Sequence, residues 1–179
     1  MLFRSEMLES QINVPLKLNK GVELRLAGKI DRADRKNDAV RVIDYKTGRD
    51  EIDFESISSL FSREGKRSKS AFQTIFYAWL YEKQLAQDQS KVSAMNSLTP
   101  GLMNRKNLFD DEFTFGHRMG RGKDKVEIHD VRPHFPEFTE QLHLLLGDLY
   151  NPDVPFSQTT EEKNCTFCPY NEICRRQPT

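Results

Sequence analysis

Two β-rich runs separated by a short polar link limit the folds that this chain can adopt more than any other feature of its sequence. Residues 22–34 and 39–46 are the two runs, and the link between them ends in Asn37-Asp38. Asn and Asp tolerate the backbone angles of tight turns, so the pattern predicts an antiparallel hairpin centred between these two residues. In that register Asp31 lies opposite Asp44. Opposed residues share one face of the sheet, with Cβ atoms about 4.5–5.5 Å apart.

The rest of the chain predicts further strands and two helices. Residues 9–18 alternate partly and indicate a strand, which Pro15 places at a sheet edge. Residues 71–87 carry apolar residues at helical spacing and predict a buried helix, and residues 136–150 predict a second helix. Residues 91–98 indicate one more strand, whereas 100–125 have no assignment.

These elements favour an α/β fold, in which a mixed sheet opens with an antiparallel meander and is flanked by the two helices. With 179 residues, 37% of them hydrophobic, the chain is long enough for one core. We expect residues 1–150 to form that core and residues 151–179 to form an irregular, cysteine-bearing tail of the same domain.

Charge and composition exclude several classes of protein. Lys plus Arg and Asp plus Glu both number 27, so no overall positive field draws the chain to nucleic acid, and any polyanion site must be local. No apolar run is long enough to span a membrane or mark secretion. The three cysteines are an odd number confined to one end, which favours a reduced, cytoplasmic compartment or a cofactor clip over a disulfide framework.

The predicted hairpin gathers chemically useful groups. Like charges at Asp31 and Asp44 need a cation beside them, and Lys46 projects from the same face as Asp44 because strand side chains alternate. Two carboxylates, the Tyr45 carbonyl and one amine suit a hard divalent ion with a cation next to it. Such a site fits phosphodiester hydrolysis, with Lys46 orienting water or binding the developing oxyanion. Gly28 favours a close approach of backbone or substrate.

Three segments in this order resemble a known family. They are Gly28-Lys-Ile-Asp31-Arg32, Asp44-Tyr45-Lys46-Thr47-Gly48 and Gln73-Thr-Ile-Phe-Tyr77. Together they resemble the PD-(D/E)XK nuclease superfamily, and within it the RecB-like nuclease domain of bacterial helicase–nuclease complexes, over roughly residues 9 to 81 and the cysteine tail. The resemblance implies a restriction-endonuclease-like fold and Mg²⁺ or Mn²⁺ as cofactor. It also implies metal binding by Asp31 and Asp44, catalysis by Lys46, and support of the site or DNA contact by Arg32, Gln73 and Tyr77.

The cysteines Cys165, Cys168 and Cys174 follow a C-x2-C-x5-C spacing, with proline after the second. The AddB-like branch of the family ends in the same spacing, and there a fourth, upstream cysteine completes a [4Fe–4S] cluster. The family also has a helix before its first strand, often with a His or Glu at the metal. This chain contains neither, so we interpret it as the C-terminal piece of a longer protein, which carries the cluster only at full length. Glu9 is either a substitute metal ligand or a structural acid.

Two other states of the cysteines stay open. Zinc needs a fourth ligand, which His129, His134 or His143 could supply, but their spacing does not indicate a zinc site. Free thiols are the other state.

Contacts with DNA phosphates must come from local basic clusters. One precedes the predicted helix and comprises Arg63, Lys66, Arg67 and Lys69. A second lies in the Gly-rich stretch, at Arg118, Arg121, Lys123 and Lys125, and its role stays undecided. No base-reading module is recognisable.

Three hypotheses follow. The chain is a metal-dependent DNA exonuclease domain, partnered by a helicase, that processes DNA ends for recombinational repair. It is alternatively a catalytically silent DNA-end-binding or structural module of the same complex. Finally, it is a small metal-binding interaction domain, in which case Asp31 and Asp44 do not pair.

Overall fold

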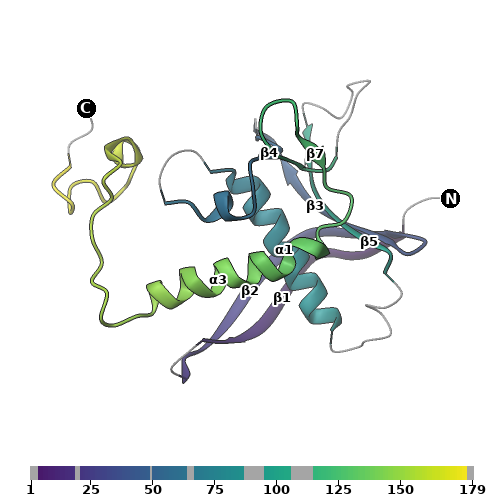
Figure 1. Cartoon of the computed structure of the whole chain (residues 1–179), viewed down its shortest axis with the longest axis horizontal. Coiled ribbons are helices and arrows are strands. Elements are labelled where there is room, and N and C mark those ends of the chain that lie inside the picture. Colours follow the sequence, from purple (N-terminus) through teal and green to yellow (C-terminus); the bar gives the residue numbers. More distant parts are fainter. Residues whose placement is uncertain are drawn as a thin grey trace.

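The computed structural model describes residues 4–18, 21–48, 50–63, 67–86, 95–105 and 115–176. Its main element is a four-stranded mixed sheet with the order β1-β2-β3-β5. The strands are β1 (Arg4–Lys17), β2 (Glu23–Lys36), β3 (Ala39–Lys46) and β5 (Ser97–Asn104). The first three form an antiparallel meander, and β5 runs parallel to β3 (Figure 1). The expectation of an α/β fold with a mixed sheet and an opening meander is confirmed.

The β2–β3 hairpin has the predicted register. Lys36 pairs with Ala39 next to the turn, and the ladder runs to the pair of Arg32 and Ile43. Asn37 has φ 53°, a left-handed conformation that Asn adopts more readily than most residues. The turn chemistry therefore places the hairpin as the sequence indicated. The ladder ends one residue short of Asp31 and Asp44, so their side chains meet just beyond the paired region.

Asp31 also lies at an interruption of the β1–β2 ladder. Leu8 pairs with Arg32 and Ser10 pairs with Ile30, but Glu9 and Asp31 between them do not pair. Glu9 has φ 46°, which breaks the regular extended backbone. β1 is the edge strand, as Pro15 predicted, although it begins at Arg4 rather than at residue 9.

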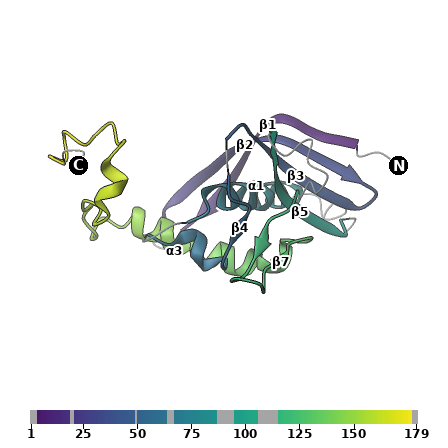
Figure 2. The same cartoon turned by 90° about the horizontal axis from the view of Figure 1, so that it is seen from above.

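Two helices cover one side of the sheet. Figure 2 shows α1 (Lys69–Leu85) lying between the strands of the main sheet and α3 (Phe135–Leu149). α1 begins at the N-cap Ser68, whose hydroxyl accepts a hydrogen bond from the Ala71 N–H at 3.2 Å. Trp79, which is 1% exposed, donates a hydrogen bond to Thr139 of α3 at 2.9 Å. Both helices were expected, with bounds that differ by one or two residues.

One strand of a second, small sheet lies within residues 100–125, which the sequence left without an assignment. Its order is β4-β6-β7, with β4 (Asp53–Phe54), β6 (Arg118–Met119) and β7 (Val126–Glu127). Three short 3₁₀ helices complete the described structure, η2 (Ser58–Phe61), η4 (Arg132–His134) and η5 (Glu162–Cys165). Strands of two residues carry no periodic signal, which explains why the sequence did not predict them.

The predicted strand at 91–98 agrees with the structure at residues 97–98 and is wrong at residues 95–96. Residues 91–94 lie outside the described residues, and β5 instead runs from Ser97 to Asn104. β5 contains Pro100 and Gly101, two residue types that are uncommon inside strands. Pro100 is tolerated because β5 is an edge strand, and Gly101 is needed because the carbonyl oxygen of Phe115 occupies the space of a Cβ atom.

The tail that follows α3 projects away from the sheet and the helices (Figure 1). Its hydrogen bonds link residues of the tail to one another, for example Gln158 to the Cys174 carbonyl at 3.1 Å. Phe156 and Phe167 of the tail are 86% and 96% exposed. Across the described part of the chain, no helix combines the length and the apolar character that crossing a membrane requires.

Candidate active site

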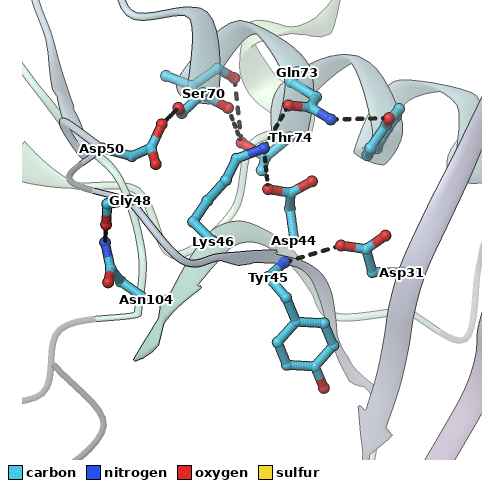
Figure 3. A network of polar contacts seen from close by, with 12 residues as sticks. Asp31, Asp44, Tyr45, Lys46, Gly48, Asp50, Ser70, Gln73, Thr74 and Asn104 are labelled. Carbon is cyan, nitrogen blue, oxygen red and sulfur yellow. Dashed lines mark hydrogen bonds and ion pairs between the residues drawn. The ribbon is translucent and has the colours of Figure 1, made fainter. Parts of the chain in front are cut away.

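The end of β3 places three consecutive residues with different surroundings. Asp44 is 3% exposed and Lys46 lies on the same face, because side chains two residues apart on a strand share a face. The Lys46 Nζ atom lies 2.8 Å from Asp44 Oδ2 (Figure 3). Tyr45 between them is 45% exposed, and its ring points away from Lys46. β3 therefore presents an ion pair on its helix-covered face and an aromatic ring on the other.

Asp31 reaches this ion pair from β2. Its Oδ2 atom accepts a hydrogen bond from the Tyr45 N–H at 2.9 Å, which holds the two acidic side chains next to each other. Burial raises the pKa of Asp44, the ammonium of Lys46 opposes this, and the charges of Asp31 and Asp50 raise the pKa further. The structure thus brings together Asp31, Asp44 and Lys46, which the sequence predicted as the catalytic group.

The helix α1 completes the surroundings of Lys46. Lys46 Nζ donates to Gln73 Oε1 at 2.9 Å, and Gln73 Nε2 donates to the Tyr77 hydroxyl at 3.0 Å. Gln73 and Tyr77 are four residues apart and share one helix face. Gly28 of β2 allows this contact, because a Cβ atom there would lie 2.8 Å from the Tyr77 ring.

Lys46 is a cation in this arrangement. Burial lowers its pKa, but the close carboxylate of Asp44, with a smaller contribution from Asp50, outweighs burial, so the pKa of Lys46 lies above its ordinary value. An ammonium has three N–H donors. Among the described residues, Asp44 and Gln73 are the contacts of Lys46, which leaves one donor for a water or a phosphate oxygen.

Sequence reasoning missed a set of residues that holds the loop after β3. The Ser70 hydroxyl donates to Asp50, and the Asn104 amide donates to the Gly48 carbonyl at 2.6 Å. Asn104 is the register partner of Lys46 at the end of β5. Ser70 lies one helical turn before Gln73 and therefore on the same helix face. That spacing was the only feature of the sequence that could have identified Ser70. These contacts fix the loop against α1 and β5.

A buried histidine was also missed. His117 is 0% exposed, and its Nε2 atom lies 2.6 Å from the Thr74 hydroxyl on α1. Its Nδ1 atom lies 2.8 Å from the Ile52 carbonyl. Burial lowers the pKa of His117 to about 4, so the ring is neutral near pH 7. His117 therefore ties α1 to the segment that leads into β4.

The other predicted contact residues lie outside this cluster. Arg32 donates to Asp34 at 2.7 Å rather than to the acids at the end of β3. Arg63 pairs with Asp148 at 2.6 Å, and Arg67 and Lys69 are exposed. Lys66 lies outside the described residues. Their roles as phosphate contacts stay predictions.

The second basic cluster is largely compensated by acids. Asp53 pairs with Arg118 at 2.8 Å and with Lys125 at 2.7 Å, and Arg121 pairs with Glu55. Lys123 is exposed. These ion pairs neutralise most of the positive charge of the Gly-rich stretch, so its attraction for phosphate is reduced.

The donor set at the end of β3 fits a hard divalent ion. The buried Oδ2 atom of Asp44 accepts no hydrogen bond of normal geometry from the described residues, although Lys46 Nζ lies close to it. In the described part of the chain, no group of three or more His, Cys, Asp or Glu residues could hold a metal by itself. Mg²⁺ is commonly held by one or two carboxylates and completed by water and substrate oxygens, which Asp31, Asp44 and the Tyr45 carbonyl satisfy. Glu9 instead pairs with the exposed Lys29.

The cysteines do not form a metal site by themselves. Cys165, Cys168 and Cys174 are free and half-buried. Among the described residues, no three His, Cys, Asp or Glu side chains form a group that could hold a metal, so the three cysteines are not gathered into one site. His129, one of the candidate zinc ligands, is 80% exposed and faces Glu127.

Comparison with known proteins adds to this geometry. The family model described as the PD-(D/E)XK nuclease superfamily matches residues 3–175. No curated protein matches the chain. The mixed sheet with antiparallel strands and two helices fits the restriction-endonuclease-like α/β fold that the sequence resemblance implied.

Proposed function

Because this chain belongs to the PD-(D/E)XK nuclease superfamily, we propose that it is a divalent-metal-dependent DNA exonuclease domain of a RecB/AddB-like helicase–nuclease. In this role it processes DNA ends for recombinational repair in the cytoplasm, with a helicase domain or subunit as its partner. The observation that carries the proposal is the ion pair of the buried Asp44 with the partly exposed Lys46, with Asp31 beside it.

Each group of the site has a distinct task in this proposal. Asp31, Asp44 and the Tyr45 carbonyl would hold Mg²⁺ or Mn²⁺, and the ion would supply a more acidic water and would offset negative charge on the phosphoryl oxygens. Lys46 donates its remaining N–H to the attacking water or to a phosphoryl oxygen. Because the pKa of Lys46 is raised, it acts as a donor and point charge rather than as a base.

Gln73 and Tyr77 orient Lys46. The Tyr77 hydroxyl accepts from Gln73 Nε2, so the amide oxygen of Gln73 faces the ammonium. A fixed ammonium loses less freedom when the substrate arrives, which supports catalysis by positioning. We assign positioning roles to both residues.

The cysteine tail is part of the proposal. The spacing of Cys165, Cys168 and Cys174 supports a [4Fe–4S] cluster in the full-length protein, with a fourth ligand from outside these three residues. Anaerobically purified full-length protein is expected to contain iron and sulfide in equal amounts, lost when Cys168→Ser is introduced. Zinc in place of iron would contradict this assignment.

Digestion of linear single- and double-stranded DNA tests the main proposal. The protein is incubated with Mg²⁺ or Mn²⁺, with EDTA as the metal-free control. Lys46→Ala is expected to lower kcat by at least about 100-fold, because the transition state loses its cationic donor. Lys17→Ala is the matched control, since Lys17 forms an exposed 2.8 Å ion pair with Glu23 at the far end of β1.

Three outcomes separate the hypotheses. Metal-dependent cleavage that only Lys46→Ala loses supports the exonuclease. DNA-end binding without cleavage by the unchanged full-length protein favours the silent end-binding module. Equal activity of Lys46→Ala and Lys17→Ala would exclude Lys46 from the chemistry.

A further inference from the structure

Hydrolysis of a phosphodiester releases a proton from the attacking water, and a residue that receives this proton speeds the reaction. Lys46 does not receive it, because its pKa is raised and an ammonium has donors but no acceptor. Asp31 and Asp44 are the carboxylates assigned to the divalent ion. Asp50, in the loop that follows β3, is a further carboxylate at this end of the sheet.

Asp50 is held against α1 one helical turn from the contact of Lys46. The Ser70 hydroxyl donates to Asp50 Oδ1, and Lys46 Nζ donates to Gln73 Oε1 at 2.9 Å. Side chains three positions apart on a helix are neighbours, with Cβ atoms about 5–6 Å apart. The Asp50 carboxylate and the Lys46 ammonium therefore contact adjacent positions on one helix face. Figure 3 shows the Lys46 side chain between the carboxylates of Asp44 and Asp50.

The electrostatics at the end of β3 agree with this placement. Burial has the largest effect on the pKa of Asp44 and on that of Lys46, and the contact between these two residues has the next largest. The charge of Asp50 also raises the pKa of both residues. A charge acts on two groups in this way when it is near both of them. Asp50 thus lies beside the ion pair as well as beside Ser70.

One oxygen of Asp50 is not engaged by the protein. Oδ1 accepts from Ser70, whereas Oδ2 accepts no hydrogen bond from the residues that the structure describes. Oδ2 lies 3.7 Å from the position that a Cβ atom of residue 48 would take, and Gly48 has no side chain to cover it. Lys46 keeps one N–H beyond its contacts with Asp44 and Gln73. A free acceptor and a free donor therefore lie close together.

The loop that carries Asp50 is fixed on both sides. The Ser68 hydroxyl donates to the Glu51 carbonyl at 3.1 Å, and the Asn104 amide donates to the Gly48 carbonyl at 2.6 Å. A group held in this way needs little rearrangement when it receives a proton. The buried Ser70 hydroxyl needs an acceptor, but an amide oxygen would serve it as well as a carboxylate. The anchoring explains an acceptor at position 50 and does not explain an acid.

We propose that Asp50 is the general base of the nuclease, and that one water accepts the free N–H of Lys46 while it donates to Asp50 Oδ2. As the water oxygen bonds to phosphorus, its O–H bond breaks and the proton passes to Oδ2. The bond from phosphorus to the leaving oxygen breaks at the same time. That oxygen takes a proton from the solvent, and Asp50 returns its own proton there, so one water is consumed for each bond cut. This inference rests on the proposed nuclease function and adds a catalytic residue to it.

Substitution by asparagine separates proton transfer from anchoring. Asp50→Asn keeps an oxygen that accepts from Ser70 but has no carboxylate to take a proton. We expect its kcat on linear DNA with Mg²⁺ to fall at least about 100-fold, as for the loss of a general base. Asp50→Glu keeps a carboxylate and should retain more activity than Asp50→Asn. Glu23→Gln is the matched control, because Glu23 pairs with Lys17 on the exposed far end of the sheet, and it should cleave like the unchanged protein.

Binding measurements show whether the asparagine has disturbed the rest of the site. With Ca²⁺ in place of Mg²⁺, the dissociation constant for a fluorescein-labelled oligonucleotide should stay within about threefold of the unchanged protein. The dissociation constant for Mn²⁺, measured by calorimetry without DNA, should also stay within about threefold. A loss of kcat with both constants preserved is the result that a proton acceptor requires.

The alternative role of Asp50 is structural, because a negative charge near the N-terminus of α1 stabilises the helix. If that is its only role, Asp50→Asn lowers the thermal midpoint and still cleaves DNA like the unchanged protein, which refutes the inference and leaves the nuclease standing. A loss of cleavage with an equal loss of Mn²⁺ binding would make Asp50 a metal ligand and also refute it. If the unchanged protein cleaves no DNA, both the inference and the proposed function fall.

Discussion

His117 provides a pH-dependent test of how α1 is held beside the site. Its ring is 0% exposed and lies between the Thr74 hydroxyl at 2.6 Å and the Ile52 carbonyl at 2.8 Å. With Nδ1 donating to the carbonyl, Nε2 accepts from Thr74, which requires the neutral ring. Burial accordingly lowers the pKa of His117 to about 4.

Acidification should therefore destabilise the fold through this residue. Well above pH 6.5 the histidine is neutral in both the folded and the unfolded chain, so its contribution to stability is complete. As the pH falls from 6.5 towards 4, the unfolded chain binds a proton that the folded chain does not. The full difference in pKa corresponds to about 3 kcal/mol, of which about 2 kcal/mol is lost at pH 5.

Urea unfolding at pH 7.5 and pH 5 measures this loss. Trp79 is the single tryptophan and is 1% exposed, so its fluorescence reports the core. The unchanged protein should lose about 2 kcal/mol more than His117→Gln between the two pH values, because the variant cannot titrate there. His129→Gln, at a side chain that is 80% exposed, is the control and should behave like the unchanged protein.

Equal losses in the unchanged protein and His117→Gln would refute this reasoning. If the glutamine variant does not fold, the titration of the His117 ring protons by NMR decides instead. A midpoint near 6.5 would show that burial does not oppose protonation of the ring.

Four further measurements test the packing and the metal site. Gly101→Ala should lower the free energy of unfolding by at least about 2 kcal/mol, because the Phe115 carbonyl occupies the space of the new Cβ. Gly147→Ala in α3, with nothing within 4 Å of its new Cβ, should instead raise it by up to about 1 kcal/mol in the same urea titration. Gly28→Ala should displace the Tyr77 ring, 2.8 Å from the new Cβ, and reduce DNA cleavage more than it reduces the thermal midpoint. Adding Mg²⁺ should raise that midpoint and EDTA should reverse the increase, whereas a midpoint independent of both would contradict a bound divalent ion.

Short-range patterns predicted the elements that depend on neighbours in the chain. Asn37 and Asp38 set the turn, and the turn set the register of β2 and β3. The spacing of apolar residues predicted α1, whose Ser68 cap lies just before the predicted start. In these segments the residues that decide the structure lie within a few positions of one another.

The predicted strand at 91–98 failed because its position depends on distant contacts. Pro100 and Gly101 normally mark a break in a strand. They are acceptable only because β5 is an edge strand and because the backbone of Phe115 approaches Gly101. Neither condition is visible in the local sequence.

The candidate site divides in the same way. The sequence alone predicted that Asp31, Asp44 and Lys46 share one face of a hairpin, and the structure places them together. The contact of Lys46 with Gln73 joins residues 27 positions apart. Only the resemblance to a known family indicated that Gln73 belongs to the site.

Contacts between distant segments determine the buried hydrogen bonds that no local pattern predicted. Thr74 and His117 are 43 positions apart, and their hydrogen bond exists only because the small sheet docks beside α1. Turn chemistry and residue periodicity specify how neighbours in the chain arrange themselves. Which buried polar groups find partners depends on how the finished elements pack, because a hydrogen bond in the core forms only where two separate surfaces meet.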